Sequence, residues 1–342
     1  MSLRAPELAQ ALVELDALKV HYRTTPQPVR AVDGVDLTLF AGETLALVGE
    51  SGCGKSTLAR ALAGLEPPTS GALRFLGAPL EPFPSPARRA RCRDLQMVFQ
   101  DPDASLNPRM TVERAIAEPL ELHERLKHGA RTNRVLELMQ DVGLDPALRL
   151  RYPHELSGGQ RQRVCIARAI AVRPKLLILD EAVSALDVSI QAQILNLLLD
   201  LKSQFALSYL FITHDLRVVR HVADRVAVMY LGRIVELGPT DQLFEAPAHP
   251  YTEALLASVP AIGAPASRVT AIQGEPPSPA NPPPGCHFQT RCPDVLDRCR
   301  TEAPELYPVG RTGRRVARCF LFEEQAVTAA QTEPPAREPN PV

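Results

Sequence analysis

The sequence predicts an α/β fold with a mainly parallel sheet and, on its N-terminal side, a small antiparallel β subdomain. Two observations carry this prediction. Short apolar runs alternate with helical patterns beyond the first forty residues, and such alternation is typical of sheets whose parallel strands are connected by helices. The first apolar segments of the chain have no helical pattern between them, which favours antiparallel pairing.

Five short apolar runs are the predicted strands of the parallel sheet, because buried strands of such sheets are continuously apolar. They span residues 45–48, 96–99, 176–179, 210–213 and 226–229. Antiparallel strands are predicted over residues 12–22, 29–39 and 72–75. Apolar positions at helical spacing predict helices within 112–144 and along 190–201, the second helped to start by Ser189.

The composition narrows the class of function. A chain of 342 residues with a net charge of −1 has room for about two domains and no global basic field to attract nucleic acid. No signal-peptide pattern is seen, and no apolar run reaches the ~18 residues that a membrane helix requires. We therefore expect a cytosolic protein that binds no nucleic acid. Clusters among its seven cysteines would point to metal or redox chemistry, because disulfides are rare in the cytosol.

The composition changes near residue 260. Prolines become frequent beyond it, and four of the seven cysteines lie there, as is typical of a domain boundary. We expect a main domain over residues 1–260, with a helical subdomain at about 101–165, and a small irregular domain bearing the four cysteines over 261–324. Residues 325–342 have few large apolar side chains and are expected to be disordered.

A glycine-rich loop follows the first predicted strand of the sheet. Residues 49–56 read Gly-Glu-Ser-Gly-Cys-Gly-Lys-Ser and match the pattern G-x-x-x-x-G-K-[ST]. Glycines let backbone N–H groups turn toward phosphate oxygens at the start of a helix. Lys55 is expected to reach the β- and γ-phosphates of ATP, and the Ser56 hydroxyl to bind Mg²⁺. The residues predicted to bind ATP here are Gly49, Ser51, Gly52, Cys53, Gly54, Lys55, Ser56 and Thr57.

Two acidic residues, Asp180 and Glu181, follow the predicted strand 176–179. They come at its carboxyl end, where ligands of open α/β sheets bind. Asp180 is expected to hold Mg²⁺ through water. Glu181 is expected to act as general base or to polarise the attacking water, because hydrolysis of the γ-phosphate needs a positioned carboxylate. Such a pair alone is often only a solvated strand end, and the upstream glycine-rich loop favours the catalytic interpretation.

The turn formed by Ser157, Gly158, Gly159 and Gln160 begins another predicted helix. A hydroxyl and amides at a helix N-terminus form a second anion site, although an ordinary helix cap uses the same residues. The chain has only one lysine-bearing loop of this kind, so one copy offers two phosphate sites for one nucleotide. Two copies arranged head to tail resolve this, since each turn then closes over the ATP of the other copy.

These residues resemble the ATP-binding cassette (ABC) ATPases over roughly residues 10–260. The resemblance implies the ABC form of the P-loop NTPase fold and the hydrolysis of ATP. It also implies roles for five further residues. Gln100 would sense Mg²⁺ and the attacking water and contact a membrane partner, and His214 would contact the γ-phosphate. Ser184 and Asp187 would belong to a loop that crosses to the opposite subunit, and Tyr22 would stack on adenine.

Several segments are similar to the ATPase subunits of dipeptide and oligopeptide importers. They are Gln100-Asp101-Pro102 with residues 105–112, residues 152–157, His249-Pro250-Tyr251-Thr252, and a tail over 285–319 that resembles the C-terminal extension of those subunits. The resemblance implies ATP-driven uptake of dipeptides or oligopeptides. Nickel, glutathione or another small solute stays open as cargo, because other subunits choose it. A soluble ABC protein that acts on ribosomes or DNA is disfavoured, since such proteins usually carry two cassettes or a long coiled-coil insertion.

The resemblance also implies partners. They are a second ABC ATPase subunit, with a heterodimer favoured over a homodimer, two transmembrane permease subunits, and an extracytoplasmic solute-binding protein. The chain would then be a peripheral protein at the cytoplasmic face of the inner or plasma membrane. ATP and Mg²⁺ would join two cassettes, and hydrolysis would let them reopen.

Four cysteines, Cys286, Cys292, Cys299 and Cys319, lie within 34 residues of the tail. Four thiolates can bind an iron–sulfur cluster or a structural Zn²⁺. Zinc sites usually contain C-x2-C pairs, which are absent among these four, and the importer ATPases that the chain resembles are associated with clusters at this extension. We therefore expect a [4Fe–4S] cluster that holds the small domain together, with Zn²⁺ or metal-free packing as the alternatives.

Overall fold

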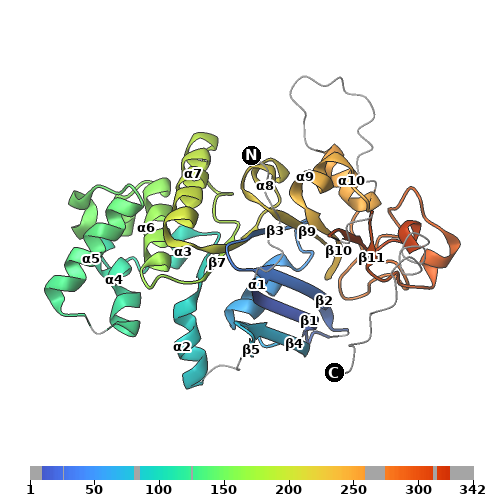
Figure 1. Ribbon diagram of the computed structural model, residues 1–342, viewed down its shortest axis with the longest axis horizontal. Coiled ribbons are helices and arrows are strands. Elements are labelled where there is room, and N and C mark those ends of the chain that lie inside the picture. Colours follow the sequence, from blue (N-terminus) through green and yellow to red (C-terminus); the bar gives the residue numbers. More distant parts are fainter. Residues whose placement is uncertain are drawn as a thin grey trace, which may run out of the picture.

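The computed structural model describes residues 10–25, 27–80, 85–124, 126–258, 274–310 and 314–323. Two sheets occupy the middle of the molecule, with one group of helices at one end and the C-terminal region at the other (Figure 1). The tail predicted to be disordered, residues 325–342, lies outside the described residues. None of the helices within the described ranges is both long and apolar enough to cross a bilayer.

The smaller sheet is antiparallel, which confirms the prediction. In the order β2-β1-β4-β5, its strands are β2 (Val29–Phe40), β1 (Ala11–Tyr22), β4 (Ser70–Phe75) and β5 (Ala78–Pro79). The pairing of β1 shifts register between Leu15 and Leu18, and Ala17 there has a φ of 44° and donates its N–H to Asp36 Oδ1 at 2.7 Å. The shift keeps both leucines on the buried face, which an even alternation would not do.

The larger sheet has the strand order β11-β12-β10-β9-β3-β8-β7-β6. Its parallel part consists of β9 (Arg225–Tyr230), β3 (Thr44–Val48), β8 (Ser208–Ile212), β7 (Leu176–Asp180) and β6 (Leu95–Val98). Each of these strands coincides with one predicted apolar run, and β3, β7 and β8 are buried along their whole length. This is the behaviour of parallel strands that are covered on both faces.

Three further strands, which the apolar runs did not predict, extend the larger sheet with antiparallel pairs and make it mixed. They are β10 (Arg233–Pro239), β12 (Val316–Ala317) and β11 (Tyr307–Pro308). Because β11 and β12 come from the C-terminal region, that region is joined to the sheet by backbone hydrogen bonds.

The helices follow the strands in the alternating order that the sequence indicates. They are α1 (Lys55–Ala63), α2 (Pro86–Asp94), α3 (Pro102–Ser105), α4 (Val112–His123), α5 (His128–Asp141), α6 (Gly158–Ile170), α7 (Val188–Phe205), α8 (Leu216–Val222), α9 (Thr240–Glu245) and α10 (Pro250–Ala257), with the short 3₁₀ turns η1 (Pro146–Leu150), η2 (Pro153–Glu155), η3 (Asp297–Arg300) and η4 (Phe320–Phe322).

The helical pattern within 112–144 forms two helices, α4 and α5, because the chain is extended at Glu124 and Lys127; this allows Leu120 of α4 and Leu138 of α5 to share one core. One detail of the helices differs from expectation, since Ser189 does not cap α7. It lies inside the first turn, and Asp187 occupies the cap position without a side-chain hydrogen bond.

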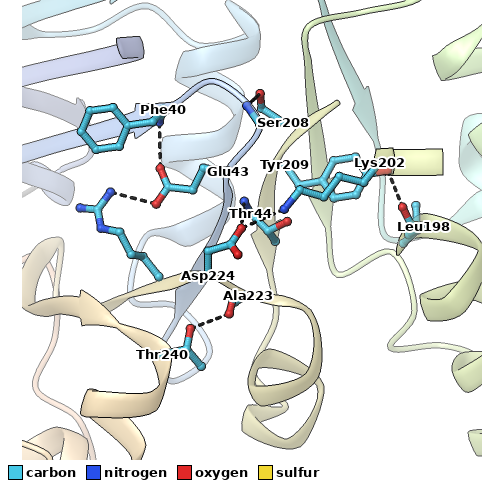
Figure 2. A network of polar contacts seen from close by, with 12 residues as sticks. Phe40, Glu43, Thr44, Leu198, Lys202, Ser208, Tyr209, Ala223, Asp224 and Thr240 are labelled. Carbon is cyan, nitrogen blue, oxygen red and sulfur yellow. Dashed lines mark hydrogen bonds and ion pairs between the residues drawn. The ribbon is translucent and has the colours of Figure 1, made fainter. Parts of the chain in front are cut away.

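The amino ends of three parallel strands are tied together by a polar network (Figure 2). Asp224, just before β9, accepts hydrogen bonds at Oδ2 from the backbone N–H of Thr44 and from Lys202 Nζ, both at 2.8 Å. Glu43 accepts one from Arg225 at 2.9 Å. These contacts stabilise the end of the sheet opposite to the carboxyl ends of its strands, where ligands of such sheets bind.

A buried ion pair fastens the C-terminal region to the sheet. Glu236 of β10 has no exposed surface, and its Oε1 accepts from Arg315 Nε at 3.0 Å and Nη2 at 2.7 Å. Its carboxylate also accepts from the backbone N–H groups of Ala248 and His249. A buried carboxylate with this many donors is well compensated for the loss of water, so the C-terminal region has a specific seat on the cassette.

Candidate active site

The glycine-rich loop runs from the carboxyl end of β3 to the start of α1, as predicted. At Gly49 a Cβ would lie 2.2 Å from the carbonyl oxygen of Met229, and at Gly54 it would lie 1.9 Å from that of Ala31. The φ angles of 154° and 109° at these two glycines are also unfavourable for residues with side chains. Only glycine therefore allows the loop to pass so close to β2 and β9.

Lys55 lies at the centre of this loop. Its side chain is 5% exposed, and its Nζ donates to the carbonyl oxygens of Gly49 at 2.8 Å and Glu50 at 2.9 Å, with Cys53 Sγ at 3.7 Å. The loop thus encloses an ammonium group at the N-terminus of a helix, where anions are favoured. Phosphate oxygens are stronger acceptors for it than neutral carbonyls.

Ser56 and Asp180 form the second part of the site. Ser56 Oγ donates to Asp180 Oδ1 at 3.0 Å, which joins the first turn of α1 to the end of β7. Burial raises the pKa of Asp180, and the hydrogen bond from Ser56 partly opposes that rise. A buried carboxylate beside a hydroxyl offers the oxygen ligands that Mg²⁺ prefers.

Glu181, Gln100 and His214 meet at one carboxylate oxygen. Gln100 Nε2 donates to Glu181 Oε2 at 3.2 Å, and His214 Nδ1 lies 3.5 Å from the same oxygen. Glu181 has a φ of 48° and donates its N–H to Ile212 at the end of β8. The structure therefore brings together three residues that follow three different strands, in an arrangement that can orient water beside a phosphate.

The adenine-stacking candidate, Tyr22, lies at the end of β1 next to the helix that follows the loop. Its hydroxyl is 3.4 Å from Thr57 Oγ1, and its ring is partly buried. Tyr22 and Thr57, both predicted to bind ATP, are thus in contact.

The turn that contains Ser157 caps α6. Ser157 Oγ accepts from the N–H of Gln160 at 3.3 Å, and Gln160 Oε1 accepts from the N–H of Ser157 at 2.9 Å. In the part of the chain that the structure describes, no hydrogen bond or ion pair joins this turn to the glycine-rich loop. A Cβ at Gly159 would lie 2.8 Å from Ile190 Cγ2 of α7, so α7 packs closely on the turn.

Ser184 and Asp187 lie on an exposed segment between β7 and α7. Ser184 Oγ donates to the carbonyl oxygen of Glu181 at 2.9 Å. The segment is therefore fixed to the backbone of Glu181 at one end while Val188, at its other end, is 81% exposed.

The four cysteines of the tail, Cys286, Cys292, Cys299 and Cys319, line one pocket together with Phe288 and Phe320. Burial raises the pKa of the Cys292 thiol to about 12 and that of Cys319 to about 11, and neighbouring cysteines of the set add to both shifts. Within the described ranges, no three His, Cys, Asp or Glu side chains are close enough together to hold a metal ion. The structure thus gathers the four thiols around a pocket without assembling a ligand set.

Two residues in contact with the loop were not predicted as site residues. Tyr251 and Arg291 both contact Glu50. For Tyr251 a signal was present, since it belongs to the segment His249-Pro250-Tyr251-Thr252. Nothing in the sequence near Arg291 indicates a contact with a residue more than two hundred positions away.

Comparison with known proteins agrees with this geometry. Residues 32–184 match the ABC transporter family, and residues 235–299 match the C-terminal region of oligopeptide/dipeptide transporters. The chain is 56% identical over 279 residues to the di/tripeptide transport ATP-binding protein DppF of Pseudomonas aeruginosa, covering 81% of this chain and 86% of that protein. It is 50% identical over 313 residues to the oligopeptide transport ATP-binding protein OppF of Salmonella typhimurium, covering 88% and 94%.

A solved structure has the same fold over the cassette. The dimeric post-hydrolysis structure of the ATP-binding cassette MJ0796, bound to ADP and Pi, is 28% identical with a TM-score of 0.62 and covers 67% of this chain and 99% of that chain. The mixed sheet, the antiparallel subdomain and the glycine-rich loop are thus those of an ABC cassette. The chain belongs to the ABC transporter family as an ATP-hydrolysing subunit with the C-terminal region of the oligopeptide/dipeptide transporters.

Proposed function

We propose that this chain is the ATPase subunit that drives import of dipeptides or oligopeptides through a membrane permease. The observation that carries the proposal is the union, in one chain, of the nucleotide site with a C-terminal region of the oligopeptide/dipeptide transporter type. The two relatives described above are named for transport of di/tripeptides and of oligopeptides.

In the proposed mechanism Gly49, the loop residues from Ser51 to Thr57, and Tyr22 hold ATP. Lys55 exchanges its two carbonyl acceptors for oxygens of the β- and γ-phosphates, because a charge-assisted hydrogen bond is stronger than a neutral one. Glu181 accepts a proton from the attacking water. Gln100 and His214 orient that carboxylate, and His214, whose side chain is 61% exposed, is accessible to the γ-phosphate.

The donor set also fits a metal ion. Ser56, Gln100 and Asp180 would hold Mg²⁺, which would supply positive charge to the phosphate oxygens. The contact of 3.0 Å between Ser56 and Asp180 already places one hydroxyl and one carboxylate at the same point.

We propose that a second cassette completes each site. The turn of Ser157, Gly158, Gly159 and Gln160 would bind the ATP of the partner, and Ser184 and Asp187 would lie at the interface. The exposure of residues 184–189 supports this assignment. A related ATPase is the favoured second subunit, with two permease subunits and an extracytoplasmic solute-binding protein, so that the chain would lie at the cytoplasmic face of the membrane.

The tail is proposed to hold a [4Fe–4S] cluster on Cys286, Cys292, Cys299 and Cys319, with Zn²⁺ as the alternative. The shared pocket supports the choice of ligands. The four thiols would have to move inward to bind. The cluster would clasp a region, residues 261–324, that we propose as a small domain beside the cassette of residues 1–260 and its helical subdomain at about 101–165.

Reconstitution tests the transport function. The chain should co-purify with two permease subunits and a second ATPase, and in proteoliposomes its ATP hydrolysis should rise when a peptide-loaded binding protein is added. A complex that responds to nickel or glutathione and not to peptides would refute the cargo while leaving the ATPase assignment intact.

A further inference from the structure

The phosphate-binding loop is held from outside its own motif. Glu50, its second residue, receives two hydrogen bonds from Arg291 of the C-terminal region, from Nη1 to Oε2 at 2.9 Å and from Nη2 to Oε1 at 3.0 Å. The Arg291 side chain is 5% exposed and that of Glu50 is 25% exposed. A two-bond arginine–carboxylate pair fixes the orientation of the carboxylate as well as its position.

A second contact reaches the backbone of the same residue. The N–H of Glu50 donates to the hydroxyl oxygen of Tyr251 at 2.9 Å. The Tyr251 ring is fully buried, with its centroid 4.6 Å from that of Tyr230 and 5.4 Å from that of Phe288. Arg291 also lies 3.4 Å from the Tyr230 hydroxyl through Nη1. The hydroxyl that contacts the loop is therefore mounted on a packed aromatic cluster.

Glu50 is consequently held on three sides. Tyr251 accepts from its N–H, Arg291 binds its side chain, and Lys55 donates to its carbonyl oxygen at 2.9 Å. Lys55 is the residue expected to meet the phosphates, so the position of Glu50, together with that of Gly49, sets where its ammonium group lies before nucleotide arrives. A loop ordered in advance loses less conformational freedom when the ligand binds.

We propose that Arg291 and Tyr251 are positioning residues for the phosphate-binding loop, and that the segment 286–292 of the C-terminal region thereby sets the affinity for nucleotide. Arg291 directly precedes Cys292, and Phe288 lies between Cys286 and Cys292. A change in the cysteine pocket that moves this segment moves the support of the loop, and by linkage nucleotide binding affects the segment in return. This positioning role requires only that the loop binds nucleotide, and it does not depend on which solute is carried or which metal is bound.

Nucleotide titration of the full-length chain tests the proposal. With N-methylanthraniloyl-ATP as the probe, Arg291→Ala should raise Kd roughly tenfold, equivalent to about 1.4 kcal/mol. Arg291→Lys keeps the charge but loses the two-bond geometry, so its Kd should lie between that of Arg291→Ala and that of the native chain. Tyr251→Phe keeps the ring and removes only the hydroxyl, and should raise Kd roughly threefold. In the assembled transporter the KM for ATP should rise by the same factors, while kcat at saturating ATP stays within about twofold.

Arg300→Ala is the matched control, because Arg300 belongs to the same region but its side chain is exposed and does not line the cysteine pocket; its Kd should be unchanged. The double variant Arg291→Ala with Glu50→Gln should bind the nucleotide no more weakly than whichever single variant has the higher Kd, because both substitutions remove the same interaction. The proposal is overturned by an unchanged Kd in Arg291→Ala, by equal loss in Arg300→Ala, by additive effects of Arg291 and Glu50, or by a fall in kcat with unchanged KM. If Arg291→Ala does not fold, native Kd values in both Arg291→Lys and Tyr251→Phe overturn it.

Discussion

Replacing Glu181 by glutamine separates nucleotide binding from hydrolysis. The carboxylate lies at the end of β7 and contacts Gln100 Nε2 at 3.2 Å and His214 Nδ1 at 3.5 Å through one oxygen. Glutamine has the same shape and can present its amide oxygen to Gln100. The local structure should therefore persist, at a stability cost of about 1 kcal/mol or less for one altered hydrogen bond at a partly exposed site.

The chemical effect should be much larger. An amide cannot accept the proton of the attacking water, and removing a positioned general base typically costs a factor of about 10² to 10⁴ in rate. That factor corresponds to about 3–5 kcal/mol of transition-state stabilisation. The Kd for ATP should change by less than about threefold, because Lys55 and the loop amides, which we propose bind the phosphates, are unaltered.

The assay is phosphate release by the assembled transporter at saturating ATP and Mg²⁺, paired with nucleotide titration of the same preparation. Glu137→Gln is the matched control, since Glu137 is an exposed glutamate that pairs with Arg134 of the same helix, away from the candidate site, and its turnover should be native. Turnover of Glu181→Gln within about threefold of the native rate would show that this carboxylate is not the base.

Three other predictions concern assembly, stability and the tail. In mixed dimers that carry one Ser157→Ala chain, hydrolysis should fall at the ATP site of the partner, and loss confined to the variant chain's own site would contradict the head-to-tail arrangement. Glu236→Ala should lower the free energy of unfolding, measured in urea, by about 3–5 kcal/mol, because it leaves Arg315 buried without its carboxylate partner. A loss below about 1 kcal/mol would mean that this pair stabilises the fold no more than an ordinary surface ion pair. After anaerobic purification, Cys292→Ser should reduce iron, sulfide and visible absorption whereas Cys165→Ser should not, and a colourless native protein with stoichiometric zinc, or with no metal, would rule out the cluster.

Some features of this protein follow from the sequence because they are local. A parallel strand that is covered on both faces must be continuously apolar, so β3, β7 and β8 are visible as runs. The glycine-rich loop is visible because its close approach to Met229 and Ala31 excludes every side chain. The order of these signals along the chain indicated an α/β fold with a nucleotide site, and the resemblance to ABC ATPases implied the cassette fold and its ATPase activity.

Elements that depend on distant partners escaped prediction. β12 has two residues and exists because β10 offers a strand to pair with, and β11 exists because of β12. The helical pattern within 112–144 did not fix where α4 ends and α5 begins, because that boundary depends on the packing of both helices on one core. Serine is a residue type that often caps helices, but α7 begins one residue before Ser189.

The residues of the candidate site also fall into those that the sequence predicted and those that only the structure brought to light. The spacing of the motifs predicted Lys55, Asp180 and Glu181 as site residues, because the role of each depends on its residue type and on its place at the end of a strand or the start of a helix. Only the tertiary structure decided that Arg291 and Tyr251 hold Glu50, since a contact across more than two hundred residues leaves no periodicity or motif in the chain. The sequence by itself therefore determined the fold and the reactive groups, and the folding of the C-terminal region onto the cassette decided what supports them.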